Sequence, residues 1–170
     1  MTQRTILAAR SLLLCLAAAS ALNAQEMSPA PAASLRQGVR ATLDAYREHA
    51  AAGRWDALIA LYDDNPHFRW VESGVVVSRS VGRIHEHLGE LPAGTRIETT
   101  FQDAEIMPLA PGVAEVVTPF QTRVVDAKGG GYSFGGVMTL VLVQRGGGWK
   151  ILSGHASSST RRSPSPRADD

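Results

Sequence analysis

The chain has 170 residues, with 17 lysines and arginines against 16 aspartates and glutamates, and a formal net charge of +1. This length predicts one folded domain. The near-zero charge argues against a nucleic-acid-binding protein, because such proteins carry a basic patch or stripe.

The first 24 residues have the pattern of a secretory signal peptide. Arg4 and Arg10 flank the start of the chain, a short apolar run follows, and Ala21 and Ala24 end two small-residue cleavage sites. The run is shorter than the roughly 20 apolar residues of a membrane span. Cleavage would remove Cys15, the only cysteine, so the mature protein would have no disulfide. We therefore expect an exported protein, periplasmic or secreted, that has no membrane attachment after cleavage.

The rest of the chain divides into three parts by composition. Residues 25–33 are rich in proline and alanine and predict a flexible leader, and residues 158–170 predict a disordered tail because they are polar and lack apolar periodicity. The part between them, residues 34–157, is expected to form the folded domain.

Helices are predicted in the first half of this domain, where apolar residues recur at helical spacing. These helices are expected over residues 34–53, 54–64 and 80–91. Residues 67–80 lie between the last two helices. Before Gly74, the side chains of this stretch alternate with a period of two residues, which indicates a short hairpin-like structure.

The second half of the domain is rich in β-strand signals. The runs expected to form strands are residues 96–109, 112–126, 132–145 and 148–157. Their short glycine-containing connections favour antiparallel pairing. In VMTLVLV, from Val137 to Val143, both alternating faces are apolar, and such a sheet must be covered on both faces. The helices can cover one face, so we expect a second subunit on the other face and hence a homodimer.

Two stretches carry a resemblance to a known family. The first, AGRWDALIALYDDNPHFRWVESG, has Gly53, Trp55, Leu58, Leu61, Tyr62, Asp63 and Asp64 in the family's pattern. The second, GGWKILSGHASS, has Gly148, Trp149, Ile151, His155 and Ser157. Together they resemble the nuclear transport factor 2-like superfamily, in its SnoaL-like, ketosteroid isomerase-like branch.

This resemblance implies an α+β fold, a cone-shaped half-barrel of curved antiparallel sheet with three N-terminal helices. The helices would close one end of the cone, the concave sheet would line a pocket, and the outer face would form a dimer. The family contains enzymes, ligand binders and assembly modules, so membership does not by itself indicate an activity.

His155 is the first candidate for the pocket. Strand alternation predicts that Trp149, Ile151, Ser153, His155 and Ser157 share one side, which by the resemblance faces the pocket. His155 could then act as an acid or base, or donate to a ligand, because histidine titrates near neutrality. The alternative is a structural histidine that is hydrogen-bonded near the strand end.

Trp70, Glu72 and His87 are the other candidates. In the isomerase branch a catalytic aspartate follows the Y-x-D-D motif, but here Trp70 stands nearest that place, with Glu72 two residues on. Glu72 could be a base in an apolar pocket or a solvated carboxylate beside the turn. His85 and His87 point about 200° apart on their helix, so they cannot chelate one metal ion, although His87 could reach the pocket.

We therefore expect an exported SnoaL-like protein that binds a small, partly apolar molecule, without a metal or other cofactor and without nucleic acid. The expected pocket residues are Trp70, Glu72, His87, Ser153, His155 and Ser157. The alternative is a lyase, isomerase or hydrolase in which His155 works with a pocket carboxylate such as Glu72. The spacing of the polar residues does not reveal a second catalytic group, which favours the binding protein.

Overall fold

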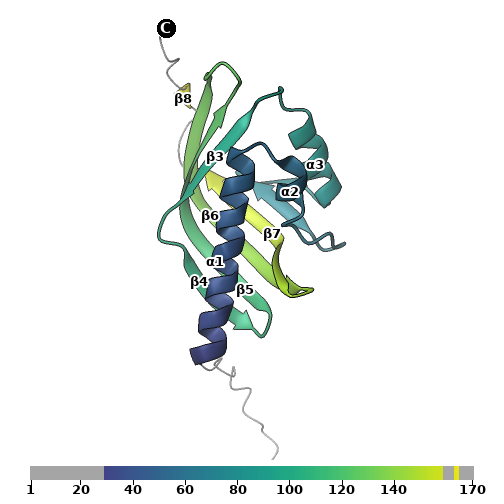
Figure 1. Cartoon of the computed structure of the whole chain (residues 1–170), viewed down its shortest axis with the longest axis vertical. Helices are drawn as coiled ribbons and strands as arrows, with labels where there is room; N and C mark the ends of the chain where they lie inside the picture. The colour runs from purple at the N-terminus through teal and green to yellow at the C-terminus, as the bar shows by residue number, and fades with distance from the viewer. Residues whose placement is uncertain (1–28, 159–162, 165–170) are drawn as a thin grey trace, which may run out of the picture.

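The computed structural model describes residues 29–158 and 163–164, so the predicted signal peptide lies outside it. A long helix, α1 (Pro29–Ala51), crosses the concave side of a curved sheet and contacts β3, β4 and β7 (Figure 1). This helix begins at Pro29 rather than at Ser34, so the last part of the predicted leader is helical. Prolines are tolerated there because N–H groups in a first helical turn have no helical partner.

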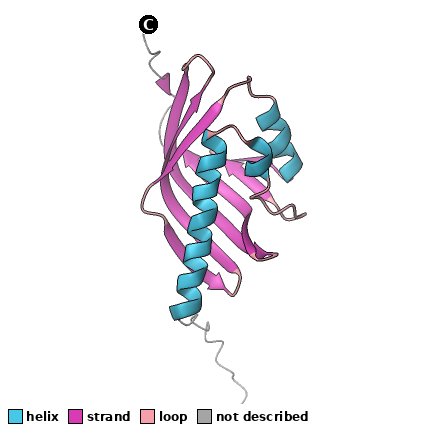
Figure 2. Cartoon of the chain, viewed as in Figure 1, coloured by secondary structure: helices cyan, strands magenta, loops and turns pink. Residues whose placement is uncertain are grey.

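Two short helices complete the helical layer on the same side of the sheet (Figure 2). Helix α2 (Trp55–Ile59) follows α1, and α3 (Val81–Gly89) follows the hairpin of β1 (Arg69–Glu72) and β2 (Val75–Ser78). The Ser80 side chain caps α3 by accepting the N–H of Arg83 at 3.3 Å. Among the described residues, no helix is long and apolar enough to cross a membrane.

The remaining strands are β3 (Arg96–Phe101), β4 (Glu105–Ala110), β5 (Val113–Val125), β6 (Gly131–Arg145), β7 (Gly148–Ser158) and β8 (Ser163–Pro164). The sheet has the order β2-β1-β7-β6-β5-β3, with β4 also paired to β5 and β8 to β6. Neighbouring strands run antiparallel except for β1 and β7, which are parallel. The predicted α+β cone of curved sheet and three helices is confirmed, while β8 places two residues of the predicted disordered tail in the sheet.

Strand β6 separates the two faces of the sheet as its alternation predicted. Met138, Leu140 and Leu142 are buried on the concave face under the helices. On the convex face Val137 is 46% exposed and Val141 is half-buried, whereas Val143 is buried. Val137 is therefore the most exposed apolar residue of β6 on the convex face.

Strand β7 contains a β-bulge, and the residues after it point to the face opposite to the one that regular alternation predicts. Leu142 pairs with Ile151, but the preceding Val141 pairs with Ser153, so Leu152 is an extra residue on β7. An extra residue reverses the alternation of all residues after it. Trp149 and Ile151 therefore face the helices before the bulge, and Gly154 and Ala156 face them after it.

Candidate functional site

Aromatic rings fill the concave side of the sheet beside β1. The Tyr62 ring, just after α2, lies 5.7 Å from the rings of both Phe68 and Trp70, with interplanar angles of 89° and 82°. Tyr46 of α1 adds a fourth ring, 6.5 Å from Tyr62. Edge-to-face contacts of this kind are the favoured arrangement of aromatic pairs. We call these four residues the aromatic cluster.

The Trp70 ring can occupy its place because β7 carries a glycine opposite it. Trp70 and Gly154 are partners in the parallel β1–β7 register. A Cβ atom on Gly154 would lie 2.2 Å from Cζ3 of Trp70, which is far inside contact distance. The absence of a side chain at residue 154 therefore lets the indole lie against the sheet.

Glu72 stands at the exposed edge of the aromatic cluster. It follows Trp70 by two residues on β1, so both side chains project from the concave face. The indole Nε1 of Trp70 donates a hydrogen bond of 2.8 Å to Oε1 of Glu72. The indole therefore orients the carboxylate, while the residue itself is exposed to solvent.

The hydroxyl groups of Tyr46 and Tyr62 are hydrogen-bonded to each other, close enough to Glu72 to feel its charge. Burial raises the pKa of Tyr46 and raises the pKa of Tyr62 well above its ordinary value. A hydrogen bond between the two side chains lowers the first pKa and raises the second, and the negative charge of Glu72 raises both. Both hydroxyls therefore stay protonated at neutral pH, where they act as neutral hydrogen-bonding groups and not as bases.

This burial predicts a loss of stability at high pH. Because the pKa of Tyr62 is higher in the folded than in the unfolded protein, its contribution is complete below about pH 10 and falls as the pH rises above that value. Denaturant unfolding at about pH 8 and about pH 11 should show a smaller loss for Tyr62→Phe than for the wild type. Equal losses in Tyr62→Phe and the wild type would contradict the burial of this hydroxyl.

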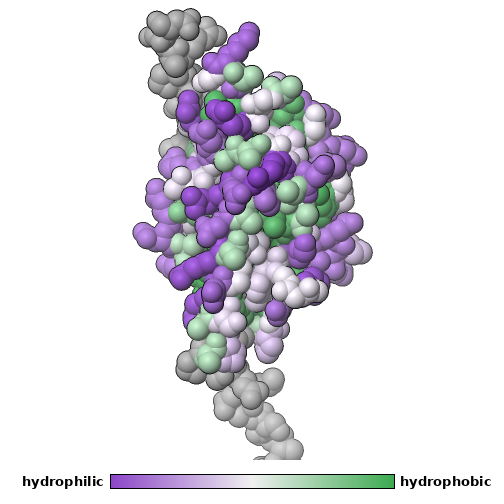
Figure 3. Space-filling view, in the orientation of Figure 1, coloured by the Kyte–Doolittle hydropathy of each residue, from purple (hydrophilic) through white to green (hydrophobic). Residues whose placement is uncertain are grey.

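Half-buried apolar side chains pack against the hydrophobic core to which the buried rings of the cluster belong. They come from α2, α3, β3 and β6 and are Ile59, Ile84, Leu88, Ile97, Phe101 and Phe134. Figure 3 shows apolar surface in the region of α2 and α3. The helical layer and the sheet therefore leave partly exposed apolar side chains around the core.

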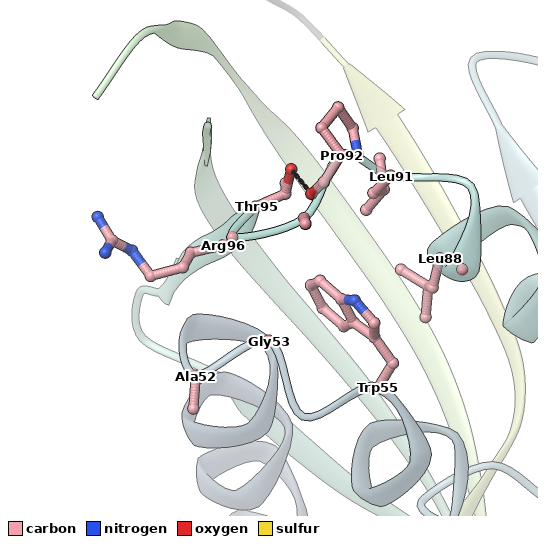
Figure 4. Close-up of a pocket in the computed structure, with 11 residues that line it drawn as sticks. Ala52, Gly53, Trp55, Leu88, Leu91, Pro92, Thr95 and Arg96 are labelled. Atoms are coloured by element: carbon pink, nitrogen blue, oxygen red, sulfur yellow. Dashed lines mark hydrogen bonds between the residues drawn. The ribbon is translucent and has the colours of Figure 1, made fainter. Parts of the chain in front are cut away.

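A hollow of about 390 Å³ lies at the helical end of this region (Figure 4). The Trp55 ring forms one wall, and Leu88, Leu91 and Pro92 lie across from it. The Thr95 hydroxyl donates to the carbonyl of Pro92 at 2.7 Å and so fixes the loop that leads into β3. Leu88 belongs both to this hollow and to the half-buried apolar group, so the hollow adjoins the concave side.

The structure places His155 on the convex face, so its predicted position in the pocket wall is wrong. His155 pairs with Thr139 and is exposed, whereas the neighbouring Gly154 and Ala156 are buried on the concave side. The bulge at Leu152 is the physical reason, because it reverses the alternation on which the prediction rested. The same bulge turns Ser153 and Ser157 to the convex face.

Of the predicted pocket residues, the structure brings together Trp70 and Glu72. His87 is exposed on α3, and its Nδ1 lies 3.0 Å from the carbonyl oxygen of Arg83 in the same helix. His85 turns instead to Asp56 of α2, with 2.9 Å between Nε2 and Oδ1. Within the described residues, no group of three histidine, cysteine, aspartate or glutamate side chains could hold a metal ion.

Tyr46 and Tyr62 are site residues that the sequence analysis did not single out. Tyr46 lies on the apolar side of α1, and Tyr62 fits the apolar spacing of the helix expected over residues 54–64, although α2 ends at Ile59. In both cases the ring alone accounts for the apolar pattern. A buried tyrosine hydroxyl usually has a hydrogen-bonding partner. Two tyrosines at apolar positions were therefore the available sign of a buried polar pair.

Residues 39–161 match the sequence profile of the SnoaL-like domain. A comparison with curated proteins found no match. Among solved structures, a type 2 hexachlorocyclohexane dehydrochlorinase superposes with a TM-score of 0.66 at 9% identity, covering 82% of this chain and 94% of that one. A nuclear transport factor 2-like protein from Salmonella enterica gives 0.65 at 15% identity, with 76% and 94% covered. A ketosteroid isomerase-like protein from Erwinia carotovora gives 0.58 at 15%, with 74% and 96% covered. At identities below 25%, these superpositions show similarity of fold alone.

Proposed function

Because the chain belongs to the SnoaL-like family of the nuclear transport factor 2-like superfamily, we propose that it binds a small, partly apolar molecule on the concave face of its sheet. The observation that carries the proposal is the oriented carboxylate of Glu72 at the edge of the aromatic cluster. Ligand sites combine apolar contact surface with a few placed polar groups, and this part of the fold offers both.

The test is native mass spectrometry of protein purified from its source. We expect a retained small molecule on the wild type, and about a tenfold lower bound fraction in Glu72→Gln, which keeps the shape but loses the charge. Glu98→Gln is the matched control, because Glu98 lies on the convex face beside Arg96 and Arg123. Wild-type protein without any bound molecule, or equal loss in both variants, would contradict the proposal.

A second candidate function is acid–base catalysis with Glu72 as the proton acceptor. It is favoured by the juxtaposition of an exposed carboxylate with two protonated tyrosine hydroxyls, an acceptor beside donors. A solved neighbour of the same fold is a dehydrochlorinase, an enzyme. His155 has no part in this version, since it lies on the other face. Chemical conversion of the retained molecule by the wild type, abolished in Glu72→Gln, would identify an enzyme of the lyase or isomerase type.

The protein is further proposed to be a homodimer through the convex face. Val137 of β6 and Met107 of β4 expose 46% and 54% of their surface there, and Val141 of β6 and Val117 of β5 are half-buried on the same face. Exposed apolar patches of this kind mark association surfaces. Sedimentation at micromolar concentration should give a dimer for the wild type and a monomer for Val137→Glu. A wild-type monomer would contradict the proposal.

Export remains a proposal that rests on the first 24 residues. The arginines before the apolar run and the small residues after it support a cleaved signal peptide. N-terminal sequencing of the exported protein should begin near Leu22 or Gln25, and an intact Met1 would contradict it.

A further inference from the structure

Glu72 carries a negative charge that no described cation neutralises. Its Oε1 atom accepts the indole N–H of Trp70, a neutral donor, and none of the ion pairs among the described residues includes Glu72. Glu98 of β3, by contrast, lies 3.7 Å from Arg96 and 3.8 Å from Arg123. The concave site therefore holds a carboxylate in place without a counter-charge from its own surroundings.

The arginines of the nearby strands are turned away from this carboxylate. Arg69 of β1 pairs in register with Ser153 on the convex face and donates to the carbonyl of Pro66 at 3.0 Å. On the next two strands of the sheet, Lys150 of β7 donates to the carbonyl of Ala60 and Arg145 of β6 pairs with Asp63. The groups beside Glu72 on the concave face are neutral rings and hydroxyls, so the local potential is negative.

Apolar surface flanks Glu72 on its own face. Val75 of β2 is its cross-strand partner and is 62% exposed. On the other side stands the aromatic cluster, in which Tyr46 is half-buried. A molecule bound at Glu72 would thus contact Val75 while its polar end meets the carboxylate. Of the aromatic cluster, Tyr46 reaches solvent, whereas the rings of Phe68, Tyr62 and Trp70 are buried behind it.

We propose that this site selects small molecules that carry a protonated amine next to an apolar group, and that it rejects carboxylates. The inference rests on the proposed binding function and adds the charge of the ligand to it. An ammonium group would donate to the Glu72 carboxylate in a charge-assisted hydrogen bond and would gain further attraction from nearby aromatic rings. Trp70 is a positioning residue here, because its indole holds the carboxylate at the concave face.

Isothermal titration calorimetry with three analogues of one shape tests the inference on the mature protein. The probes are 4-phenylbutylamine, 4-phenylbutan-1-ol and 4-phenylbutanoate. At low salt the amine should bind about tenfold more tightly than the alcohol, and the carboxylate should bind most weakly. The advantage of the amine should shrink as the ionic strength rises, because Glu72 is exposed.

Variants separate the charge from the shape of the site. Glu72→Gln should bind the amine and the alcohol equally, whereas Glu98→Gln should keep the wild-type preference. Trp70→Phe, which removes the indole donor and keeps a ring, should reduce the preference without abolishing alcohol binding.

The outcomes distinguish the amine preference from the proposed binding function on which it rests. Equal wild-type affinities for the amine and the alcohol would overturn the inference and leave the binding function standing. Absence of binding by all three probes would also overturn it, and the mass spectrum of the native protein would then decide the binding function separately.

Discussion

Trp149→Ala is expected to lower the free energy of unfolding by about 3–5 kcal/mol, the usual cost of removing a buried tryptophan. Trp149 is 9% exposed and belongs to the hydrophobic core. It fills the space left by a glycine of α1, since a Cβ atom on Gly38 would lie 2.6 Å from the indole. Thr42 donates to the Trp149 carbonyl at 3.4 Å, so α1 and β7 are joined around this side chain.

Denaturant unfolding measures the effect, and Trp55→Ala provides the comparison. Trp55 is half-buried and lines the hollow at the helical end, so its truncation should cost less. If Trp149→Ala melted within about one degree of the wild type, this residue would not be the anchor that joins the last long strand to α1.

Gly154→Ala is the second change with a large expected effect. The new methyl group would meet Cζ3 of Trp70 at 2.2 Å, so the indole must move. We expect a loss of about 1–3 kcal/mol in unfolding free energy from the overpacking. The displaced indole would also lose its hydrogen bond to Glu72, so ligand binding should weaken together with stability.

Two comparisons make this prediction specific. Gly82→Ala in α3 introduces a methyl group that meets nothing within 4 Å, and it should be neutral or slightly stabilising. In a Trp70→Ala background, Gly154→Ala should cost much less than alone, because the clashing ring is gone. Additive costs in the double variant would contradict the proposed contact.

The fold could be predicted because its signals are local and periodic. The alternation from Val137 to Val143 predicted two apolar faces, one of them covered by helices, and in the structure the covered face is that of Met138, Leu140 and Leu142. The start of α1 was missed because Pro29 and Pro31 suggest a leader, although proline is compatible with a first helical turn. The local sequence did not distinguish these two possibilities.

The site was harder to predict because one added residue changes a whole face. The sequence around Leu152 does not distinguish a bulge from a regular strand. The bulge nevertheless moves His155 from the expected concave face to the convex one. Glu72 had two readings, a pocket base or a solvated carboxylate. In the structure it is exposed and also bound to Trp70 on the concave face, so it combines features of both.

The most direct test of the concave binding site is an NMR titration of the indole N–H signals of Trp55, Trp70 and Trp149, the three tryptophans of the chain. The protein would be titrated with 4-phenylbutan-1-ol and with 4-phenylbutylamine. The account predicts that the Trp70 signal moves most, because its N–H is bonded to Glu72, and that Trp149, packed against α1, and the His155 ring stay in place. Movement of the His155 ring signals with an unchanged Trp70 signal would contradict it and would place binding on the convex face.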